Sequence, residues 1–293
     1  MTAPSPVALH PALGKQLKMS DDAFRQIREH IYDLTGIYFQ DNKKYLLEGR
    51  LGKRLQLLGL SAFEEYFQFV KFGARRNDEL KHLYDAVTIN ETFFFRNEPQ
   101  FEAFEHTLVP EILRSKSPGG KYKLRIWSAA SSSGEEAYTL AMLYLERLKP
   151  KYPSLEIEIV GTDINSTVVD TARKGLYREY SIRNMPQSYL QKYFVSSDNR
   201  FQVKDNVRCL ARFENLNLYD QVRMRQLNSF DIIFCCNVLI YFDAKSKIRV
   251  VSGLYNSLNR GGYLFIGYAE SLVSISNAFK LLNFPKTVAY KKE

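Results

Sequence analysis

The sequence predicts an α/β fold in which a doubly wound parallel sheet follows a small all-helical domain. Three observations lead to this prediction. Residues 20–89 carry apolar side chains at helical spacing and no alternating strand pattern. From about residue 121 to 293, short β-rich segments alternate with helical ones, as in sheets built from strand–helix–strand units. One segment, FDIIFCCNVLIYF at 230–242, is almost continuously apolar, which is typical of a central strand buried on both faces.

The helical domain is divided by capping residues and glycines. Ser20 can cap a first helix that ends at Gly36, and a second, leucine-bearing helix ends at Gly59. Ser61 and Glu64 have the S-x-x-E spacing of a capping box, so a third helix should begin there. A further helix with apolar residues at helical spacing follows it.

The α/β domain is expected to span residues 121–293 and to follow a linker at 90–120. Its strands are predicted at 123–130, 155–163, 230–242, 263–267 and 287–292. The strand–helix alternation indicates a parallel, doubly wound sheet. The alternation is interrupted at about 175–216, where short strand-like pieces predict a small inserted β-subdomain.

Composition excludes several classes of protein. The chain has 293 residues, of which 45% are hydrophobic and 25% charged, as in ordinary globular domains. Its apolar stretches are short or interrupted, so no membrane span is expected. Cys209, Cys235 and Cys236 form no disulfide framework, and the four histidines lack metal-ligand spacing with them. We therefore expect a cytoplasmic protein without a structural metal, and a flexible arm at residues 1–19 with no signal-peptide pattern.

The charge balance permits an acidic partner. The net charge of +9 comes from 41 Lys and Arg residues against 32 Asp and Glu residues. Residues 21–89 contain 11 basic and 11 acidic residues, whereas residues 173–225 contain 11 basic and 5 acidic residues. The excess therefore lies mainly on the predicted insert. Charge alone does not choose between nucleic acid, a lipid surface and an acidic protein.

Ligands of an open parallel sheet bind at the carboxyl ends of its strands. The first such end continues as the loop S-A-A-S-S-S-G, before a helix that begins with Glu135 and Glu136. These carboxylates would repel a phosphate at the helix N-terminus, and the G-x-G-x-x-G and P-loop patterns are absent. A cationic or zwitterionic ligand such as S-adenosylmethionine fits better. The alternative is a capped helix start with exposed glutamates.

Two further strand ends carry polar side chains. Asp163 closes the segment 155–163 and can accept hydrogen bonds from both hydroxyls of a ribose, although an aspartate there can also cap the following helix. Asn237 and Tyr241 lie toward the end of the apolar segment 230–242, where buried polar groups need partners. We expect both side chains to face the ligand crevice.

A segment upstream of the sheet, T-I-N-E-T-F-F-F-R at 88–96, contains three consecutive phenylalanines. One helix face cannot bury all three, so the segment is predicted to be a linker packed between domains. Asn90, Thr92 and Arg96 are then able to point elsewhere. For Arg96, the alternative is a surface ion pair.

Together these motifs resemble the chemoreceptor glutamate methyltransferases of the CheR family. The matching motifs are T-x-N-x-T-x-F-F-R at 88–96, W-S-A-A-S-S-S-G-E-E at 127–136, T-D-I at 162–164, N-L at 217–218 and N-V-L-I-Y-F-D at 237–243. The resemblance extends from the start of the helical domain to the end of the chain. It implies a class I methyltransferase sheet and methyl transfer from S-adenosylmethionine, which leaves S-adenosylhomocysteine. The implied acceptor is the γ-carboxylate of glutamates in the cytoplasmic helices of chemoreceptors.

The resemblance also implies roles for individual residues. The residues expected to hold the cofactor are Asn90, Thr92, Arg96, Glu135, Glu136, Asp163, Asn217, Leu218, Asn237 and Val238. Arg96 and Tyr241 are expected next to the reacting methyl group. We expect a cytoplasmic monomer whose helical domain recognises receptors, and which neither binds nucleic acid nor inserts into a membrane.

The chemistry of these residues agrees with the implied reaction. A glutamate γ-carboxylate has a usual pKa of about 4.3 and is ionised at neutral pH, so its attack needs no general base. The task of the site is to position a carboxylate oxygen behind the methyl group. The planar guanidinium of Arg96 and the hydroxyl of Tyr241 can orient that carboxylate.

Two features depart from the family pattern. The family commonly has Arg before the Asn of the N-V-L-I-Y-F run, where this chain has Cys236. The stretch between Phe194 and Val203 is short and contains no glycine. Relatives that bind a receptor's C-terminal pentapeptide tend to have a longer, glycine-containing turn there. We therefore expect this enzyme to work without that tether.

The second helix of the helical domain offers a surface for an acidic substrate. Lys43, Arg50 and Arg54 fall within about 40° of one another around a helix, and Lys53 lies farther round. Such a stripe suits the acidic helix of a receptor, which the family resemblance also indicates. The alternative is an ordinary solvated helix face.

Two other functions are compatible with these motifs. One is a class I methyltransferase that acts on RNA or on a small molecule, although the helical domain contains no recognisable nucleic-acid-binding motif. The other is a non-catalytic, cofactor-binding regulator of receptors, although Arg96 and Tyr241 are both retained.

Overall fold

The computed structural model describes residues 17–116 and 121–293 of the chain. Most of the expected N-terminal arm, residues 1–19, lies outside these ranges. Within them, no helix is both long enough and apolar enough to cross a membrane.

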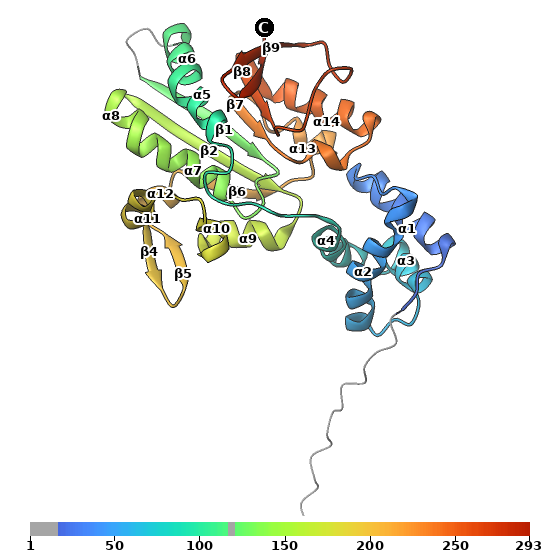
Figure 1. The fold of residues 1–293 in the computed structure, drawn as a ribbon. Helices are drawn as coiled ribbons and strands as arrows, with labels where there is room; N and C mark the ends of the chain where they lie inside the picture. The colour runs from blue at the N-terminus through green and yellow to red at the C-terminus, as the bar shows by residue number, and fades with distance from the viewer. Residues whose placement is uncertain (1–16, 117–120) are drawn as a thin grey trace, which may run out of the picture. The chain divides into compact units, whose positions relative to one another are not determined.

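The chain divides into two compact units (Figure 1). The first contains the residues up to Glu29 together with Phe39–Val87, and the second contains His30–Tyr38 together with Thr88–Glu293. The first unit corresponds to the helical domain expected at 20–89, except that residues 30–38 belong to the second unit.

The described part of the first unit is helical, as predicted. Its helices are α1 (Asp21–Thr35, which continues into the second unit), α2 (Lys44–Leu58), α3 (Phe63–Phe72) and α4 (Arg76–Val87), with a short 3-10 helix at Asp41–Lys43. The Ser20 hydroxyl accepts a hydrogen bond from the Ala23 N–H at 3.0 Å, so Ser20 caps α1 as expected. The predicted capping box between Ser61 and Glu64 is wrong. The Ser61 N–H donates to the Glu65 carboxylate at 2.9 Å instead, because α3 begins two residues after Ser61.

The leucines of α2 form part of the core of this unit. Leu47, Leu51 and Leu55 recur at every fourth position and are fully buried, as are Phe63 and Tyr66 of α3. Full burial of one such side chain stabilises the fold by about 2 kcal/mol. The burial of these leucines sets the orientation of α2, so its opposite face is turned to solvent.

The second unit contains a seven-stranded sheet in the order β6-β2-β1-β7-β8-β10-β9 (Figure 1). Its strands are β1 (Tyr122–Ala129), β2 (Leu155–Asp163), β6 (Ala211–Asn215), β7 (Phe230–Cys235), β8 (Leu258–Ile266), β9 (Phe279–Phe284) and β10 (Thr287–Lys292). Neighbours from β6 to β8 pair in parallel, whereas β10 is antiparallel to both β8 and β9. The sheet is therefore mixed at one edge. The chain order reverses between β1 and β7, where open α/β sheets bind their ligands.

Helices cover both faces of this sheet. The helices of the second unit that follow α1 are α5 (Glu98–Ala103), α6 (Val109–Lys116), α7 (Glu135–Leu143), α8 (Lys149–Lys151), α9 (Ser166–Lys174), α10 (Glu179–Ile182), α11 (Gln187–Tyr193), α12 (Asp205–Arg208), α13 (Gln221–Met224) and α14 (Ala244–Ser257), with π-helical turns at Phe104–Leu108 and Tyr144–Leu148. Strand β7 is buried along its whole length. Its Ile232 joins the hydrophobic cluster that includes α7, and its Ile233 joins the cluster that includes α14. Burial on both faces explains why the central strand is nearly continuously apolar.

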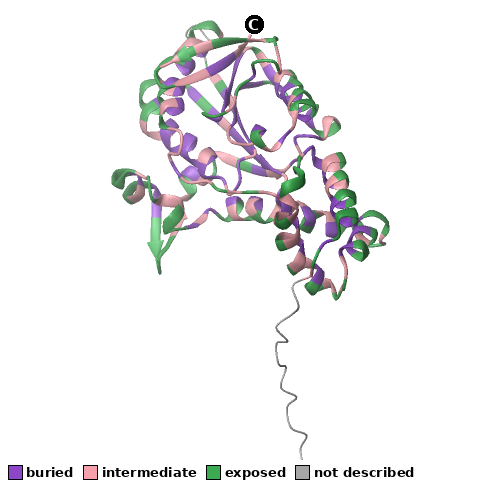
Figure 2. Ribbon diagram, turned by 45° about the vertical axis from the view of Figure 1, so that its right-hand side comes forward, coloured by how far each residue is buried: buried purple, intermediate pink, exposed green. Residues whose placement is uncertain are grey.

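A second, three-stranded antiparallel sheet forms the predicted inserted subdomain. Its order is β3-β5-β4, with β3 at Leu176–Arg178, β4 at Phe194–Ser197 and β5 at Arg200–Val203. The insert is shorter than the expected 175–216, because Ala211–Asn215 form β6 and pair in parallel with β2 in the main sheet. Beyond its first residue, β4 is exposed (Figure 2).

Candidate active site

The loop between β1 and α7 is tightly wound. Ala130, Ser132 and Gly134 all have positive φ angles, of 56°, 51° and 92°. Such angles are unfavourable for Ala and Ser, and they cluster at functional sites. The loop is bound to the end of β2, where the Ser131 N–H donates to the Thr162 carbonyl at 2.8 Å. Neighbouring contacts therefore hold the strained backbone in place.

Asp163 connects two loops at the end of β2. One carboxylate oxygen accepts from the Ser132 N–H and the other from the Asn165 N–H, both at 2.9 Å. Asp163 does not cap the following helix, so this alternative for Asp163 is wrong. Asn165 caps α9, because its side chain accepts from the Val168 N–H at 3.1 Å. Asp163 therefore stays at the strand end with a carboxylate that can accept further hydrogen bonds.

Glu135 and Glu136 begin α7 but have different surroundings. Glu135 is 1% exposed and accepts hydrogen bonds from Ser133 Oγ at 2.8 Å and Ser181 Oγ at 2.9 Å. Glu135 thus joins the loop to α10 through hydrogen bonds. Burial raises the pKa of its carboxyl group. The alternative of two exposed glutamates at a capped helix start is wrong for Glu135.

Glu136 is partly exposed and lies at the carboxyl end of β1. Its carboxylate accepts a hydrogen bond from Ser128 Oγ at 2.7 Å. Desolvation by burial raises the pKa of Glu136 to about 7, against the lowering effects of Ser128, Cys236 and the charge of Arg96. Near neutral pH this carboxyl group is therefore ready to ionise when a cation binds beside it.

The segment 88–96 packs inside the second unit. The Asn90 carbonyl accepts from Ser132 Oγ at 3.0 Å, so the segment is tied to the loop after β1. The Phe94 N–H donates to the Ser181 carbonyl at 2.9 Å, and the Phe94 ring is fully buried. Thr92 is partly exposed in the same stretch. The expected linker is therefore part of the α/β unit.

Arg96 ends this segment with its guanidinium partly exposed. Arg96 Nη1 donates to the Glu91 carbonyl at 2.7 Å, and the guanidinium carbon lies 5.6 Å from the centre of the Phe93 ring. The neighbouring Phe95 N–H donates to Thr139 Oγ1 of α7 at 3.2 Å, so the segment is bound to the helix that carries Glu136. The charge of Arg96 also lowers the pKa of the Glu136 carboxyl group. Among the described residues Arg96 forms no ion pair, which removes the surface-ion-pair alternative.

The apolar segment 230–242 leaves the sheet earlier than predicted. Strand β7 ends at Cys235, and Asn237 follows with a φ angle of +61°. A 3-10 helix then spans Leu239–Tyr241, and the Tyr241 carbonyl accepts from the Tyr38 N–H at 2.9 Å. Asn237, Val238 and Tyr241 are partly exposed here. A turn in the left-handed region, which asparagine tolerates, begins where the last seven residues of the expected strand, 236–242, leave the sheet.

Cys236 lies where the family resemblance led us to expect arginine. Its thiol lies 3.2 Å from Gln100 Oε1, and the Gln100 amide in turn donates to the Ile266 carbonyl at 2.6 Å. Burial raises the pKa of this thiol well above its usual value, so it is neutral. Glu136 therefore receives no positive charge from this position.

Asn217 and Leu218 follow β6 and are engaged within the second unit. Asn217 Nδ2 donates to the Leu34 carbonyl at 2.7 Å, and its Oδ1 accepts from the Tyr219 N–H at 2.9 Å. Leu218 is buried. Asn217 thereby holds the end of α1 against the sheet, a role that its position after a strand did not reveal.

The expected substrate-recognition residues lie on the first unit. Arg54 is bidentate to Glu79, at 2.7 and 2.6 Å, and Arg50 Nη1 donates to the Val87 carbonyl at 2.7 Å. Lys43 was expected on the second helix, but it ends the 3-10 helix Asp41–Lys43, just before α2. Lys43 is partly exposed and Lys53 is exposed, and neither forms an ion pair with a described residue. Of the four residues of this stripe, the two arginines therefore have partners within the first unit, and the two lysines are available to a binding partner.

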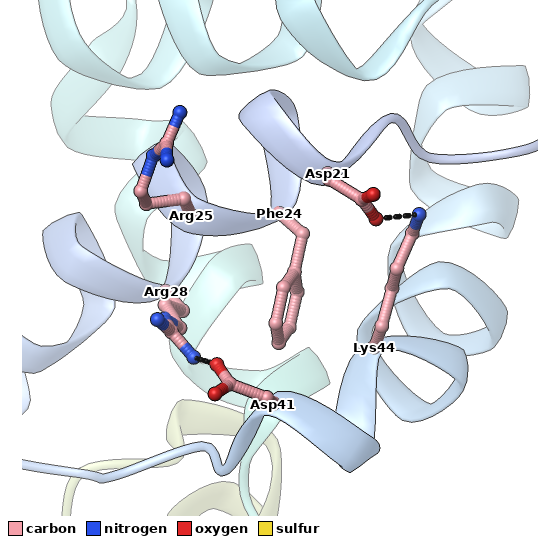
Figure 3. A pocket seen from close by; sticks show the side chains of 6 residues that line it. All are labelled: Asp21, Phe24, Arg25, Arg28, Asp41 and Lys44. Carbon is pink, nitrogen blue, oxygen red and sulfur yellow. Dashed lines mark hydrogen bonds and ion pairs between the residues drawn. The ribbon is translucent and has the colours of Figure 1, made fainter.

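A pocket in the same unit differs from this stripe. Figure 3 shows the side chains that line it, among them Phe24, and two ion pairs, Lys44–Asp21 at 2.7 Å and Arg28–Asp41. Two of its three cations pair with its own carboxylates, and the third, Arg25, pairs with Asp22. It therefore offers little net charge to an acidic ligand.

The carboxyl ends of β2, β1 and β7 bring together Asp163, Glu136 and Asn237, and segment 88–96 joins the loop after β1 through Asn90. This donor set fits S-adenosylmethionine. Glu136 can pair with its amino group and Asp163 can accept from its ribose hydroxyls. In the described part of the chain, no three His, Cys, Asp or Glu side chains are arranged to hold a metal ion.

Three features define a class I S-adenosylmethionine-dependent methyltransferase. They are a sheet of this order with β10 antiparallel, a loop of small residues after β1 and an acidic residue at the end of β2. Residues 90–288 match the family model described as the CheR methyltransferase SAM-binding domain. Residues 22–88 match the CheR methyltransferase all-alpha domain. The chain therefore belongs to the CheR family of chemotaxis protein methyltransferases.

Curated relatives align along nearly their whole length. Chemotaxis protein methyltransferase 2 of Vibrio cholerae is 37% identical over 278 residues, which cover 94% of this chain and 95% of the relative. The chemotaxis protein methyltransferase of Borreliella burgdorferi is 32% identical over 277 residues, 94% of this chain and 96% of its own. Chemotaxis protein methyltransferase 1 of Pseudomonas aeruginosa is 34% identical over 272 residues, 92% of this chain and 97% of its own.

Proposed function

We propose that this enzyme transfers a methyl group from S-adenosylmethionine to the γ-carboxylate of glutamates in the cytoplasmic helices of chemoreceptors. The observation that carries the proposal is Arg96, a guanidinium without a carboxylate partner among the described residues, on a segment that is hydrogen-bonded to α7, the helix of Glu136. A carboxylate substrate supplies the partner that Arg96 lacks.

In this proposal each side chain has a distinct task. The bound cofactor supplies a methyl group on a positively charged sulfur. Glu136 holds the amino group of the cofactor, and Asp163 holds its ribose. Arg96 and the Tyr241 hydroxyl orient the acceptor carboxylate, which is ionised already and needs no base.

A methyl-transfer assay tests the proposal directly. The enzyme is incubated with receptor-containing membranes and cofactor labelled in its methyl group, and the membranes are then treated with alkali. Glutamyl methyl esters release labelled methanol, whereas most methylated RNA bases are stable to alkali. Label that remains in an alkali-stable product, or none in the receptor, contradicts the proposal.

Cofactor binding should depend on pH through Glu136. Because burial raises its pKa to about 7, Glu136 is mostly protonated at pH 6 and mostly ionised at pH 7.5. The ionised form pairs with the cofactor's amino group, so affinity should fall about tenfold between pH 7.5 and pH 6. Titration calorimetry in two buffers of different ionisation enthalpy measures both the affinity and the released proton.

The Glu136→Gln variant provides the comparison for that titration. It removes the ionising group but keeps its size, so its weaker binding should be nearly independent of pH over the same range. A pH dependence that persists in this variant would assign the effect to another group.

We also propose that receptor methylation by this enzyme does not require a C-terminal pentapeptide. The turn between β4 and β5 consists of Asp198 and Asn199, both at positive φ, which is a tight two-residue hairpin without glycine. A receptor lacking its last five residues should be methylated at the same rate as the full-length receptor. A clear loss of rate on truncation, or saturable binding of the free pentapeptide, would refute this expectation.

A further inference from the structure

Glu270 binds two loops of the candidate active site together. It follows β8, and its carboxylate accepts three backbone N–H groups. Oε2 accepts from Asn237 at 3.0 Å and from Gly267 at 2.6 Å, and Oε1 accepts from Ile240 at 3.1 Å. Two of these amides belong to the loop after β7 and the third to the loop after β8.

The two loops are also in direct contact beside this carboxylate. A Cβ atom at Gly267 would lie 2.8 Å from the Asn237 backbone nitrogen and 2.9 Å from Asn237 Nδ2. Only glycine therefore permits this approach. Asn237 itself has a φ angle of +61°, a conformation that needs support from its surroundings.

The Glu270 carboxylate has no competing ionic role among the described residues. It forms no ion pair there and is only partly buried. Its interactions are charge-assisted hydrogen bonds to backbone amides, which are shorter and stronger than neutral ones. A residue whose carboxylate contacts only backbone amides acts by fixing backbone geometry.

We propose that Glu270 is a positioning residue for methyl transfer, which holds the segment from Asn237 to Tyr241 in the conformation that catalysis requires. The proposal rests on the proposed function, because Tyr241 is assigned there to the acceptor carboxylate. In this role Glu270 acts through the loop, by way of its hydrogen bonds to the Asn237 and Ile240 N–H groups. The sequence offered no signal for it beyond an acidic residue three positions after the glycine that ends a strand.

The Glu270→Gln variant changes this contact with little change in volume. Glutamine retains one acceptor oxygen, but its NH2 group faces an N–H of the loop and cannot accept from it. We expect turnover to fall at least about tenfold, as a small displacement of reacting groups does. Glu270→Asp keeps the charge but shortens the reach, and its turnover should lie between those of Glu270→Gln and the unmodified enzyme.

Asp220→Asn is the matched control. Asp220 also accepts two backbone N–H groups with one carboxylate oxygen, from Val222 at 3.0 Å and Arg223 at 3.1 Å, but it caps α13 and belongs to neither of the loops that Glu270 joins. Both variants should lower the unfolding temperature by similar amounts. Only Glu270→Gln should lower turnover.

A double-mutant cycle with Tyr241→Phe separates positioning from general damage. If Glu270 acts by positioning Tyr241, then Tyr241→Phe should lower turnover by a smaller factor in the Glu270→Gln background than in the unmodified enzyme. Additive effects, or a Glu270→Gln turnover within twofold of the unmodified enzyme, would overturn the proposal. The failure of the proposed function is distinguishable, since the unmodified enzyme would then form no alkali-labile ester on receptors.

Discussion

Replacing Arg96 with alanine is expected to lower the turnover of receptor methylation by about 100-fold, the effect of removing one preorganised charged donor from an active site. The guanidinium is held by the Glu91 carbonyl and lies over the Phe93 ring, so it is oriented before substrate arrives. One of its five N–H groups is used in that contact. The others are available to a carboxylate.

The measurement compares initial methylation rates at saturating cofactor with the cofactor affinity of the same variant. Tyr241→Phe removes a single hydrogen-bond donor and should lower turnover less, about tenfold. Arg25→Ala, at an exposed arginine of the first unit that pairs with Asp22, is the matched control and should leave the rate unchanged. Unchanged turnover in both Arg96→Ala and Tyr241→Phe would exclude these residues from the mechanism.

Reversing the charge of Arg54 should destabilise the first unit by about 3–5 kcal/mol, the usual cost of breaking a buried ion pair by removing one partner. The Glu79 side chain is 3% exposed, and both of its carboxylate oxygens bind the Arg54 guanidinium. The Tyr66 hydroxyl donates to Glu79 at 3.0 Å as well. Arg54→Glu would leave two carboxylates facing each other with no cation between them.

The neighbouring Lys53→Glu variant introduces the same charge change on the exposed side of α2. It should leave the free energy of unfolding nearly unchanged, because Lys53 has no ion-pair partner among the described residues. If this face binds an acidic receptor helix, Lys53→Glu should raise the Michaelis constant for receptor and leave cofactor affinity unaltered. Denaturant unfolding and methylation kinetics measure the two effects, and equal stability of both variants would refute the role assigned to Arg54.

This pair of variants refines the expectation drawn from the helical stripe. The sequence predicts only one difference among the four residues of the stripe, which is their angle around a helix: Arg50, Arg54, Lys43 and Lys53. In the structure these residues differ in their partners. Arg54 binds Glu79 of α4, and Arg50 donates to the carbonyl of the last residue of α4, Val87. Their role in receptor binding stays a prediction. Substitution of the two lysines tests this role without damage to the fold, because neither lysine forms an ion pair with a described residue.

Local signals in the chain predicted much of the fold. The strand expected at 155–163 is β2 with the same bounds, and Ser20 caps α1 as its position indicated. The strand at 287–292 likewise agrees with β10. Each of these predictions depends on residues within a few positions of one another, where side-chain alternation and capping act.

Predictions that depended on distant partners were less accurate. Residues 211–215 resemble a piece of the insert, but they belong to the main sheet because β2 offers them a parallel edge. Glu135 and Glu136 are equivalent in the sequence, yet Ser181 from α10 binds one and leaves the other near the crevice. No pattern in the chain contains this information.

The sequence by itself determined the two-part organisation, the central apolar strand, the loop after β1 and the family to which the chain belongs. Only the tertiary structure decided where the central strand ends, which carboxylates are structural, and that Glu270 supports the loop carrying Asn237. The physical reason is the range of the interactions. Periodicity and capping act within one or two helical turns, whereas a buried carboxylate takes its role from amides and hydroxyls that the fold brings to it from elsewhere in the chain.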